Sequence, residues 1–263
     1  MSAVAPTTAR VIAIVNQKGG VGKSTTAVNL GASLAVLGRR VLVIDIDPQG
    51  NTTTGFGVDK RAVERDVYTV LLQDAAIADV TRPTEIENLA IVPATLNLAG
   101  AEIELVSTFQ RESRLKAALA GVLRTYDVVL IDCPPSLGLL TVNALTAASE
   151  VSIPVQAEYY ALEGLSQLIA IVRRIKEGLN PDLMICGVLI TMFDGRTKLA
   201  TEVLEEVNRY FPDRVFQTQI PRNIRLSEAP SYGKPAILFD VKSRGAQAYL
   251  ALARELAAAQ GVA

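Results

Sequence analysis

The sequence predicts a doubly wound α/β fold, in which a mainly parallel sheet carries helices on both faces. Short apolar runs rich in β-forming residues alternate with helical stretches, and they occur at residues 11–15, 41–46, 90–92, 128–131, 151–155 and 186–192. Runs that are apolar on both faces are typical of buried parallel strands. A glycine-rich loop joins the first run to a helical stretch from Thr26, and polar residues follow several strand ends. Ligands of such sheets bind at the carboxyl ends of the strands, so we expect these polar residues to share one crevice.

The chain length favours one large domain. Of its 263 residues, 49% are hydrophobic, which is enough for one substantial core. We expect a flexible tail over residues 1–9 and a single domain over residues 10–263. A last helix is expected over residues 245–259, where Tyr249, Leu250, Ala253 and Leu256 recur at helical spacing and would pack on the sheet.

The loop over residues 18–25 reads Lys-Gly-Gly-Val-Gly-Lys-Ser-Thr. Glycines between a strand and a helix let backbone N–H groups point at phosphate oxygens, and the helix adds its positive N-terminus. Lys23 is expected to reach the β- and γ-phosphates of a nucleotide, and the Ser24 hydroxyl to ligate Mg²⁺. Gln17 stands where the ordinary P-loop has a glycine, and the additional Lys18 follows it. The sequence therefore predicts a nucleotide-phosphate site whose loop departs from the ordinary P-loop. A simple tight turn is the alternative.

Lys18 is expected to act differently from Lys23. Because Lys23 already serves the phosphates of its own site, a lysine at the outer lip of the loop is free to reach across an interface. If two subunits face each other through their loops, each Lys18 can neutralise charge on the partner's nucleotide, as an arginine finger does in trans. ATP would then hold the dimer together, and hydrolysis would release it.

Two carboxylates at strand ends are candidates for metal and water chemistry. Asp132 follows the run at 128–131 and can hold the Mg²⁺ shell through a water. Asp47 lies in the segment Asp-Ile-Asp-Pro-Gln-Gly-Asn at 45–51, where it can orient a water for in-line attack on the γ-phosphate. A cap or turn role is the alternative for Asp47, and more so for Asp45.

The composition excludes several classes of function. The chain has no histidine, which excludes Ser/His/Asp catalysis, histidine metal ligands and a histidine base. Its two cysteines, Cys133 and Cys186, lie in apolar runs and are expected to be core residues in a reducing cytosol. No run approaches the length of a membrane span, and residues 1–8 lack the pattern of a signal peptide. We therefore expect a cytoplasmic protein.

Charge is nearly balanced along the whole chain. The 26 Lys and Arg residues against 27 Asp and Glu predict neither a nucleic-acid nor a membrane partner. Residues 173–263 carry 13 basic and 10 acidic residues. An ordinary solvated surface explains this distribution as well as a binding surface does.

Four segments together resemble the ParA/Soj family of chromosome-partitioning ATPases, within the deviant-Walker superfamily that includes MinD. They are the loop at 18–25, the segment at 45–51, Asp-Cys-Pro-Pro-Ser at 132–136 and Ile-Pro-Arg-Asn-Ile-Arg-Leu-Ser-Glu-Ala-Pro-Ser at 220–231. The resemblance implies a nucleoid-associated ATPase that uses ATP and Mg²⁺, forms a homodimer on ATP and binds double-stranded DNA without sequence preference. It also implies stimulation by a ParB-type centromere-binding protein during chromosome or plasmid segregation.

The resemblance also assigns roles to residues. It makes Lys18 the signature lysine, Asp47 the hydrolytic aspartate and Thr25 an α-phosphate contact, with Mg²⁺ held by Ser24 and, through water, by Asp132. The implied ATP-binding residues are Lys18, Gly19, Gly20, Val21, Gly22, Lys23, Ser24, Thr25, Pro221 and Asn223. The implied DNA-binding residues are Arg196, Lys198, Arg225, Lys242 and Arg244, for which a solvated surface is the alternative, more weakly for Arg196 and Arg225. The first strand begins too early for a preceding helix-turn-helix, so sequence-specific DNA binding is not expected.

Three related functions are alternatives. A MinD-type membrane regulator needs a basic amphipathic terminal helix, whereas residues 243–263 contain only Arg244 and Arg254 as cations. An iron–sulfur ATPase needs two cysteines per subunit near the dimer axis, and Cys133 and Cys186 lie in different runs. An amide-forming ligase of the same superfamily shares the loop, but the segment at 220–231 favours partition.

Overall fold

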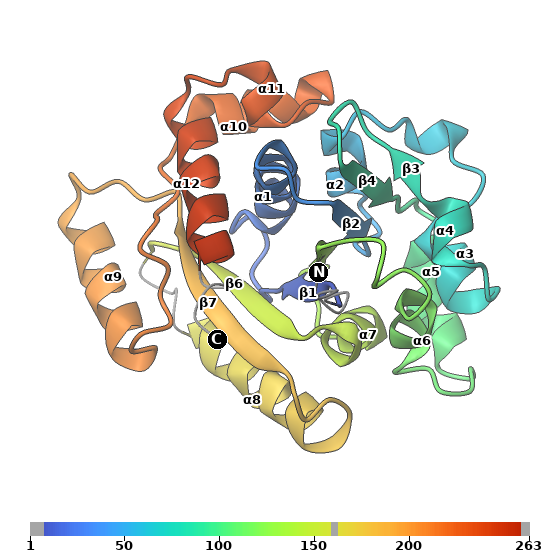
Figure 1. The fold of residues 1–263 in the computed structure, drawn as a ribbon. Helices are drawn as coiled ribbons and strands as arrows, with labels where there is room; N and C mark the ends of the chain where they lie inside the picture. The colour runs from blue at the N-terminus through green and yellow to red at the C-terminus, as the bar shows by residue number, and fades with distance from the viewer. Residues whose placement is uncertain (1–7, 159–162, 259–263) are drawn as a thin grey trace, which may run out of the picture.

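Seven strands form one sheet in the computed structural model, which describes residues 8–158 and 163–258. The sheet order is β3-β4-β2-β5-β1-β6-β7 (Figure 1). The strands are β1 Arg10–Ile14, β2 Val41–Asp45, β3 Arg82–Pro83, β4 Leu89–Val92, β5 Val128–Asp132, β6 Glu150–Gln156 and β7 Met184–Thr191. All neighbours pair in parallel except β3 and β4, which are antiparallel. The predicted doubly wound, mainly parallel fold is confirmed.

Six of these strands coincide with the predicted apolar runs, and their ends agree within two residues. Strand β3 was not predicted; it has two residues, one of them a proline. A strand this short shows no alternation of apolar and polar residues, and proline is typical only of sheet edges. The missed strand lies at the edge of the sheet, away from the phosphate loop.

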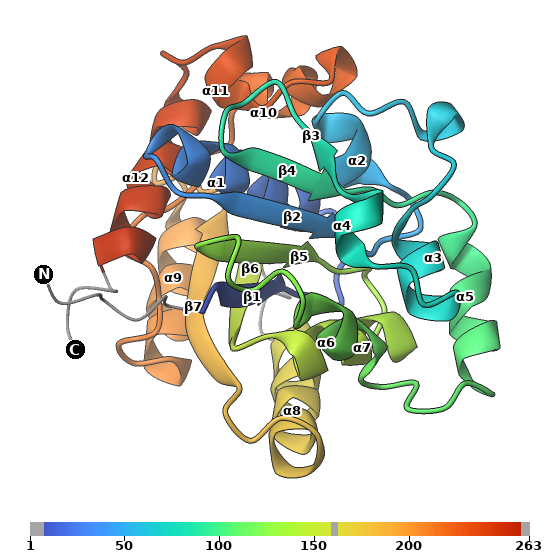
Figure 2. The same ribbon diagram turned by 45° about the vertical axis from the view of Figure 1, so that its right-hand side comes forward.

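Helices cover both faces of the sheet (Figures 1 and 2). Those on one face include α1 and α12, whereas α3, α5, α6, α7 and α8 contribute to the hydrophobic cluster on the other. The helices are α1 Lys23–Val36, α2 Asn51–Gly55, α3 Val67–Leu72, α4 Ile77–Val80, α5 Leu98–Leu105, α6 Arg114–Leu119, α7 Leu139–Ala147, α8 Glu163–Gly178, α9 Lys198–Tyr210, α10 Ile224–Glu228, α11 Ala236–Phe239 and α12 Arg244–Ala258. Two 3₁₀ turns, η1 Lys60–Ala62 and η2 Ala229–Tyr232, complete the described chain.

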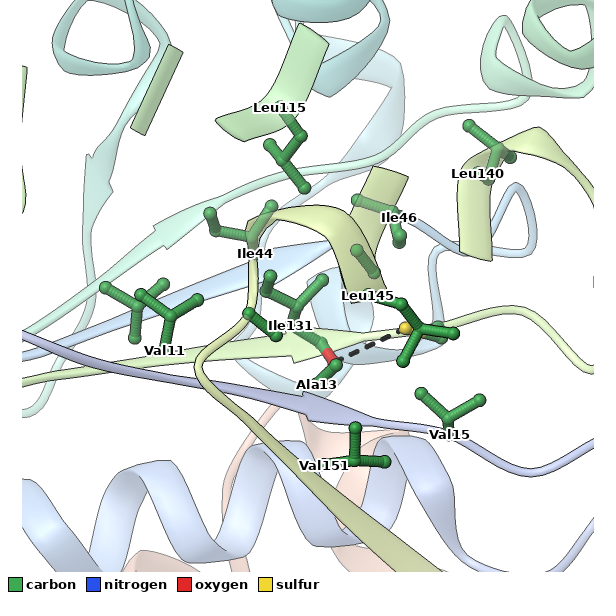
Figure 3. Close-up of a cluster of buried hydrophobic side chains, with 14 of the residues drawn as sticks. Val11, Ala13, Val15, Ile44, Ile46, Leu115, Ile131, Leu140, Leu145 and Val151 are labelled. Atoms are coloured by element: carbon green, nitrogen blue, oxygen red, sulfur yellow. Dashed lines mark hydrogen bonds between the residues drawn. The ribbon is translucent and has the colours of Figure 1, made fainter. Parts of the chain in front are cut away.

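Successive side chains of each central strand enter different cores. In β1, Val11 and Ala13 belong to the cluster with α7 and α8, whereas Ile12 and Ile14 belong to the cluster with α1 and α12. Figure 3 shows side chains of the first cluster, in which residues of the strands point toward Leu115, Leu140 and Leu145 of α6 and α7. Burial on both faces explains why the runs are continuously apolar.

The two ends of the chain are only partly described. Residues 1–7 and 259–263 lie outside the described residues. Ala9, within the predicted tail, is buried and donates its N–H to the carbonyl of Leu123. In α12, Tyr249, Ala253 and Leu256 are buried as expected for a helix packed on the sheet, and Leu250 is half-buried. Among the described helices, none has the length and apolar character needed to cross a membrane.

Candidate nucleotide-binding site

The glycine-rich loop connects β1 to α1 in a conformation that glycine favours. Gly20 and Gly22 have φ angles of 75° and 90°, a region that residues with a Cβ adopt only with strain. Gly22 is the N-cap of α1 and makes no side-chain cap, so the first N–H groups of the helix remain available to a ligand. The Thr191 hydroxyl, at the end of β7, donates to the Val21 carbonyl at 2.8 Å and holds the loop against that strand.

The loop borders a cleft of about 810 Å³, a volume in the range of small-molecule sites. The cleft is also lined by the segments after β2 and β7 and by the segment before α10. The predicted residues that line it are Gly19, Gly20, Gly22, Lys23, Ser24, Thr25, Asp47, Pro221 and Asn223. Three others lie beside or beneath this lining: Lys18, Val21 and Asp132. The strand ends thus gather the predicted segments around one crevice.

Lys23 places a cation inside the cleft. The residue is 6% exposed, and its Nζ donates to the Lys18 carbonyl at 3.0 Å. Burial lowers the pKa of Lys23, while the charges of Asp132 and Asp47 oppose that change. No carboxylate of the described chain lies within 4.0 Å of its Nζ, so the ammonium is not already neutralised by an ion pair.

Asp132 lies beneath the loop and is fully buried. Its Oδ2 accepts a hydrogen bond from Thr52 Oγ1 at 2.8 Å, whereas its Oδ1 is buried without a hydrogen-bond partner in the described chain. Burial, together with the charge of Asp45, raises the pKa of Asp132 to about 8, and the polar side chains of Ser24 and Thr52 oppose this increase. A buried carboxylate oxygen without a partner, near a serine hydroxyl, fits a hydrated Mg²⁺ ion.

The metal would need ligands beyond these two side chains. The described residues include no group of three or more His, Cys, Asp or Glu side chains that could hold a metal. Mg²⁺ usually keeps several waters and binds substrate phosphates together with one or two protein oxygens. The donor set therefore fits a metal shared with a nucleotide.

Asp45 anchors the segment that carries Asp47. It pairs in register with Asp132 on the neighbouring strand and accepts hydrogen bonds from Thr53 N, Thr53 Oγ1 and Asp47 N at 2.8, 2.7 and 3.1 Å. Burial raises its pKa to about 6, against these hydrogen bonds. Thr53 Oγ1 in turn accepts from the Ala94 N–H at 2.9 Å. This geometry supports the interpretation of Asp45 as a capping residue.

Asp47 faces the cleft with one oxygen available. Its Oδ1 accepts the Gln49 N–H at 2.9 Å in a tight turn, which fixes the carboxylate. Oδ2 has no hydrogen bond among the described residues. A fixed carboxylate with a free oxygen in a cleft can orient a water molecule.

Lys18 lies at the outer lip of the loop and outside the lining of the cleft of its own chain. Its backbone N–H donates to Asn16 Oδ1 at 2.9 Å. Its side chain is 42% exposed and forms an ion pair with Glu158 at 3.0 Å. An exposed pair of this kind contributes little to stability, typically about 0–1 kcal/mol, so the lysine can exchange partners easily.

The segment at 220–231 closes another side of the cleft. Pro221 forms a β-bridge with Phe193, and Asn223 caps α10 by accepting the Arg225 N–H at 3.0 Å. Several lining residues were not predicted from the sequence: Asn29, Thr191, Arg222, Lys234 and Tyr249. Thr191 ends β7, so the strand-end rule could have found it. Tyr249 gave no signal because it follows the apolar spacing of a core helix.

The predicted DNA-binding residues are exposed and lie outside the cleft lining. Arg196 pairs with Asp194 at 2.6 Å, Lys198 with Glu202 at 3.2 Å, and Arg225 with Glu228 at 2.8 Å and Asp240 at 3.3 Å. Lys242 and Arg244 make no ion pair within the described ranges. Neighbouring carboxylates therefore offset much of this positive charge.

Both cysteines have the surroundings of core residues. Cys133 is fully buried and its thiol donates to the Ile131 carbonyl at 3.7 Å (Figure 3). Cys186 is half-buried and its thiol donates to the Val151 carbonyl at 3.3 Å. Burial raises the pKa of both thiols. These surroundings disfavour the thiolate forms that an iron–sulfur cluster requires.

Comparison with known proteins places the chain among ATPases. A family model described as an AAA domain matches residues 9–185. The Sporulation initiation inhibitor protein Soj of Bacillus subtilis is 63% identical over 249 residues, which cover 95% of this chain and 98% of that protein. The Chromosome partitioning protein ParA of Myxococcus xanthus is 56% identical over 250 residues, covering 95% and 88% of the two chains. The structure of cobyrinic acid a,c-diamide synthase from Mycobacterium smegmatis with bound ADP and magnesium superposes with a TM-score of 0.85 at 39% identity, covering 97% and 96%.

Proposed function

This chain belongs to the Soj/ParA family of chromosome-partitioning ATPases, and we propose that ATP binding and hydrolysis switch it between a dimer on DNA and a free monomer. The observation that carries this proposal is the convergence on one cleft of the deviant loop and Asp47, with Lys18 at the outer lip. The protein would act in the cytoplasm on the nucleoid, in the segregation of a chromosome or plasmid.

ATP would bind with its phosphates on the loop. Lys23 supplies a positive charge to the β- and γ-phosphates, the N–H groups of residues 19–25 cradle the phosphates, and Pro221 and Asn223 border the base. Ser24 and, through water, Asp132 would hold Mg²⁺. When bound, the ion neutralises charge that develops on the phosphate oxygens.

Hydrolysis would depend on Asp47 and on a second subunit. Asp47 orients a water in line with the γ-phosphate, using the oxygen that Gln49 leaves free. Lys18 leaves Glu158 and reaches the phosphates of the partner's nucleotide, which couples dimerisation to ATP. In this scheme the absence of ATP leaves Lys18 paired within its own chain, so the dimer needs the nucleotide.

DNA binding would follow from dimerisation. Two copies of the surface with Arg196, Lys198, Arg225, Lys242 and Arg244 double the number of phosphate contacts, which compensates for the weak net charge of one copy. A ParB-type centromere-binding protein would then stimulate hydrolysis and release the dimer.

The test of this function is co-sedimentation with random-sequence duplex DNA in the presence of ATP, ADP or no nucleotide. We expect DNA retention with ATP alone, and faster ATP hydrolysis when DNA and the ParB-type protein are both added. Equal retention in the three nucleotide states would reject the proposed switch.

Two alternative functions are less well supported. For a MinD-type membrane regulator, the terminal helix α12 would have to lie on lipid, but its apolar residues Tyr249, Leu252 and Leu256 are buried in the core. Liposome co-sedimentation tests this alternative. For an amide synthase, the 39% identity to the synthase structure is lower than the 63% identity to Soj. ATP turnover that depends on cobyrinic acid and an amide donor would favour the synthase.

A further inference from the structure

The turn that carries Asp47 is held by a lysine from outside the cleft. Nζ of Lys60 donates a hydrogen bond to the Gln49 carbonyl at 2.7 Å. Lys60 belongs to the 3₁₀ turn η1 and is half-buried. It does not line the cleft, whereas Asp47 and Gln49 do. The proposed function gives this lysine no role, although it contacts the segment on which hydrolysis is expected to depend.

The peptide group between Gln49 and Gly50 is hydrogen-bonded at both ends. Its carbonyl accepts from Lys60, and its N–H, on Gly50, donates to the Asp47 carbonyl at 2.8 Å. Hydrogen bonds linked in such a chain polarise and strengthen one another, and a bond from an ammonium group is stronger than a bond between neutral groups. Lys60 therefore stabilises the same turn in which Asp47 Oδ1 accepts the Gln49 N–H at 2.9 Å.

The aliphatic part of Lys60 also packs against the turn. Gly50 has a φ of 62°, and a Cβ on it would lie 2.6 Å from Cδ of Lys60 and 2.9 Å from the carbonyl oxygen of Ala94. Gly50 is the N-cap of α2, which lies beside β4 in both views (Figures 1 and 2). The lysine and the segment after β4 therefore fix the point at which α2 begins.

The Lys60 ammonium group is directed at this turn alone. Within residues 8–158 and 163–258 its Nζ has no acceptor other than the Gln49 carbonyl, and no carboxylate lies within 4.0 Å of it. A lysine that served only as a surface charge would gain more from a carboxylate than from a backbone carbonyl. The geometry therefore favours a role in holding the backbone of the turn.

We propose that Lys60 is a positioning residue for ATP hydrolysis. It holds the peptide between Gln49 and Gly50, and through that peptide it fixes the direction in which the Asp47 carboxylate faces the cleft. The assignment rests on the proposed function, in which Asp47 orients the attacking water. A displacement of about 1 Å can slow a reaction by about 10², so hydrolysis is sensitive to this contact. Lys60 does not touch the nucleotide, and ATP affinity therefore does not depend on it.

Two substitutions of Lys60 separate its charge from its packing. Lys60→Met removes the ammonium group and keeps an aliphatic side chain against Gly50. We expect its ATP affinity in calorimetry to stay within about twofold of wild type and its kcat for hydrolysis to fall about tenfold, with KM unchanged. Lys60→Arg retains a cationic donor and should recover most of the lost turnover. A protein that is merely less stable would not show this division between kcat and KM.

The matched control is Arg61→Met, which removes the neighbouring cation of the same 3₁₀ turn. The Arg61 side chain is exposed and forms no ion pair in the described part of the chain, so this variant should keep wild-type turnover and ATP affinity. Equal loss of turnover in Lys60→Met and Arg61→Met would assign the effect to the net charge of the turn and overturn the proposal. Weaker ATP binding by Lys60→Met with unchanged kcat would also overturn it.

A double-mutant cycle shows whether Lys60 acts through Asp47. Two residues that serve one step are not additive, because the second substitution has nothing left to disturb once the first has removed the group that orients water. In the Asp47→Ala background, Lys60→Met should therefore leave the residual rate of hydrolysis unchanged. A further tenfold loss in the double variant would mean that the lysine acts independently of Asp47, which contradicts the proposal.

Hydrogen exchange of the full chain without nucleotide tests the contact independently of catalysis. Exchange in residues 47–56 should be faster in Lys60→Met than in wild type or Arg61→Met, because the Gly50 N–H loses support. If exchange rises as expected but Asp47→Ala hydrolyses ATP at the wild-type rate, the catalytic assignment of the proposed function fails and the positioning of the turn by Lys60 stands. If Asp47→Ala is slow but Lys60→Met matches wild type in turnover and exchange, the role of Lys60 is wrong and the proposed function stands.

Discussion

Among single residues, Lys23 and Asp47 border the same cleft, but we expect Lys23 to be needed for ATP binding and Asp47 for hydrolysis alone. Lys23→Ala removes the cation that attracts the β- and γ-phosphates, so calorimetry should show no ATP binding.

Asp47→Ala leaves that cation in place and removes only the group that orients water. We expect normal ATP affinity, hydrolysis slower by about 10² or more, and a dimer that accumulates on DNA. Wild-type turnover by Asp47→Ala would exclude this residue from the reaction.

Asp45 makes stability depend on pH. Its pKa rises from 3.8 in the unfolded chain to about 6 in the fold because it is buried. The folded state therefore holds the proton more tightly, and the free energy of unfolding falls as pH rises from about 4 to about 6, with a limiting slope of about 1.4 kcal/mol per pH unit. Asp45→Asn cannot ionise, so its destabilisation relative to wild type should be larger at pH 5 than at pH 7.5. Urea denaturation without nucleotide measures both, and a pH-independent difference would contradict the raised pKa.

At the scale of elements, η2 and the turn after α2 meet through two glycines. A Cβ on Gly233 would lie 2.6 Å from the Cα of Gly57, and the φ of Gly233 is 62°. This contact joins the segment near Pro221 and Asn223 to the segment that carries Asp47. Gly233→Ala should cost about 1–3 kcal/mol of stability from backbone strain and weaken ATP binding. Gly178→Ala, at the end of α8 with open space around it, is the control and should be neutral or slightly stabilising in thermal melts and neutral in calorimetry.

At the scale of the whole molecule, the proposed dimer depends on Lys18, whose side chain does not line the nucleotide cleft of its own chain. Lys18→Ala should bind ATP with wild-type affinity, because Lys23 still serves the phosphates, but should remain a monomer. Light scattering with a non-hydrolysable ATP analogue measures the result. Glu158→Gln, which removes only the carboxylate that pairs with Lys18 in the structure, is the matched variant and should dimerise at least as readily as wild type. A stable Lys18→Ala dimer would assign the lysine to another role.

The DNA surface also belongs to the whole molecule, because it is expected to work only in two copies. Arg225→Ala should reduce DNA retention while leaving ATP binding and dimerisation intact. Alanine is preferable to glutamate here, since a new carboxylate would lie beside Glu228 and Asp240. Arg209→Ala on α9 removes an exposed arginine outside the predicted set and should have no effect.

The salt dependence of DNA affinity shows whether Arg225→Ala removes a direct contact with a DNA phosphate or disturbs the structure. The slope of log affinity against log salt is about −0.9 for each neutralised phosphate, so the slope of the Arg225→Ala dimer should be shallower than that of wild type. An unchanged slope would place the DNA contacts elsewhere on the molecule.

The sequence by itself determined the elements and the phosphate loop of this protein. Strands buried on both faces leave continuous apolar runs, so six of the seven strands could be found, and only the two-residue edge strand β3 was missed. Gly20, Gly22, Lys23 and Ser24 stand in a local pattern that is typical of a phosphate loop, and the segments after the strands were identifiable because parallel strands end at one edge.

Only the tertiary structure decided which polar groups are satisfied and which surfaces remain open. Asp45 and Asp132 look alike in sequence. The carboxylate of Asp45 accepts hydrogen bonds from Thr53 and Asp47, whereas Asp132 has a buried oxygen without a hydrogen-bond partner in the described chain. Tyr249 and Asn29 reach the cleft from helices, and the pairing of Lys18 with Glu158 joins residues 140 positions apart. The apolar residues of α5 look like core residues in the sequence, yet some of them are exposed. Burial and pairing depend on which distant segments the sheet order brings together, and local sequence patterns carry no information about those neighbours.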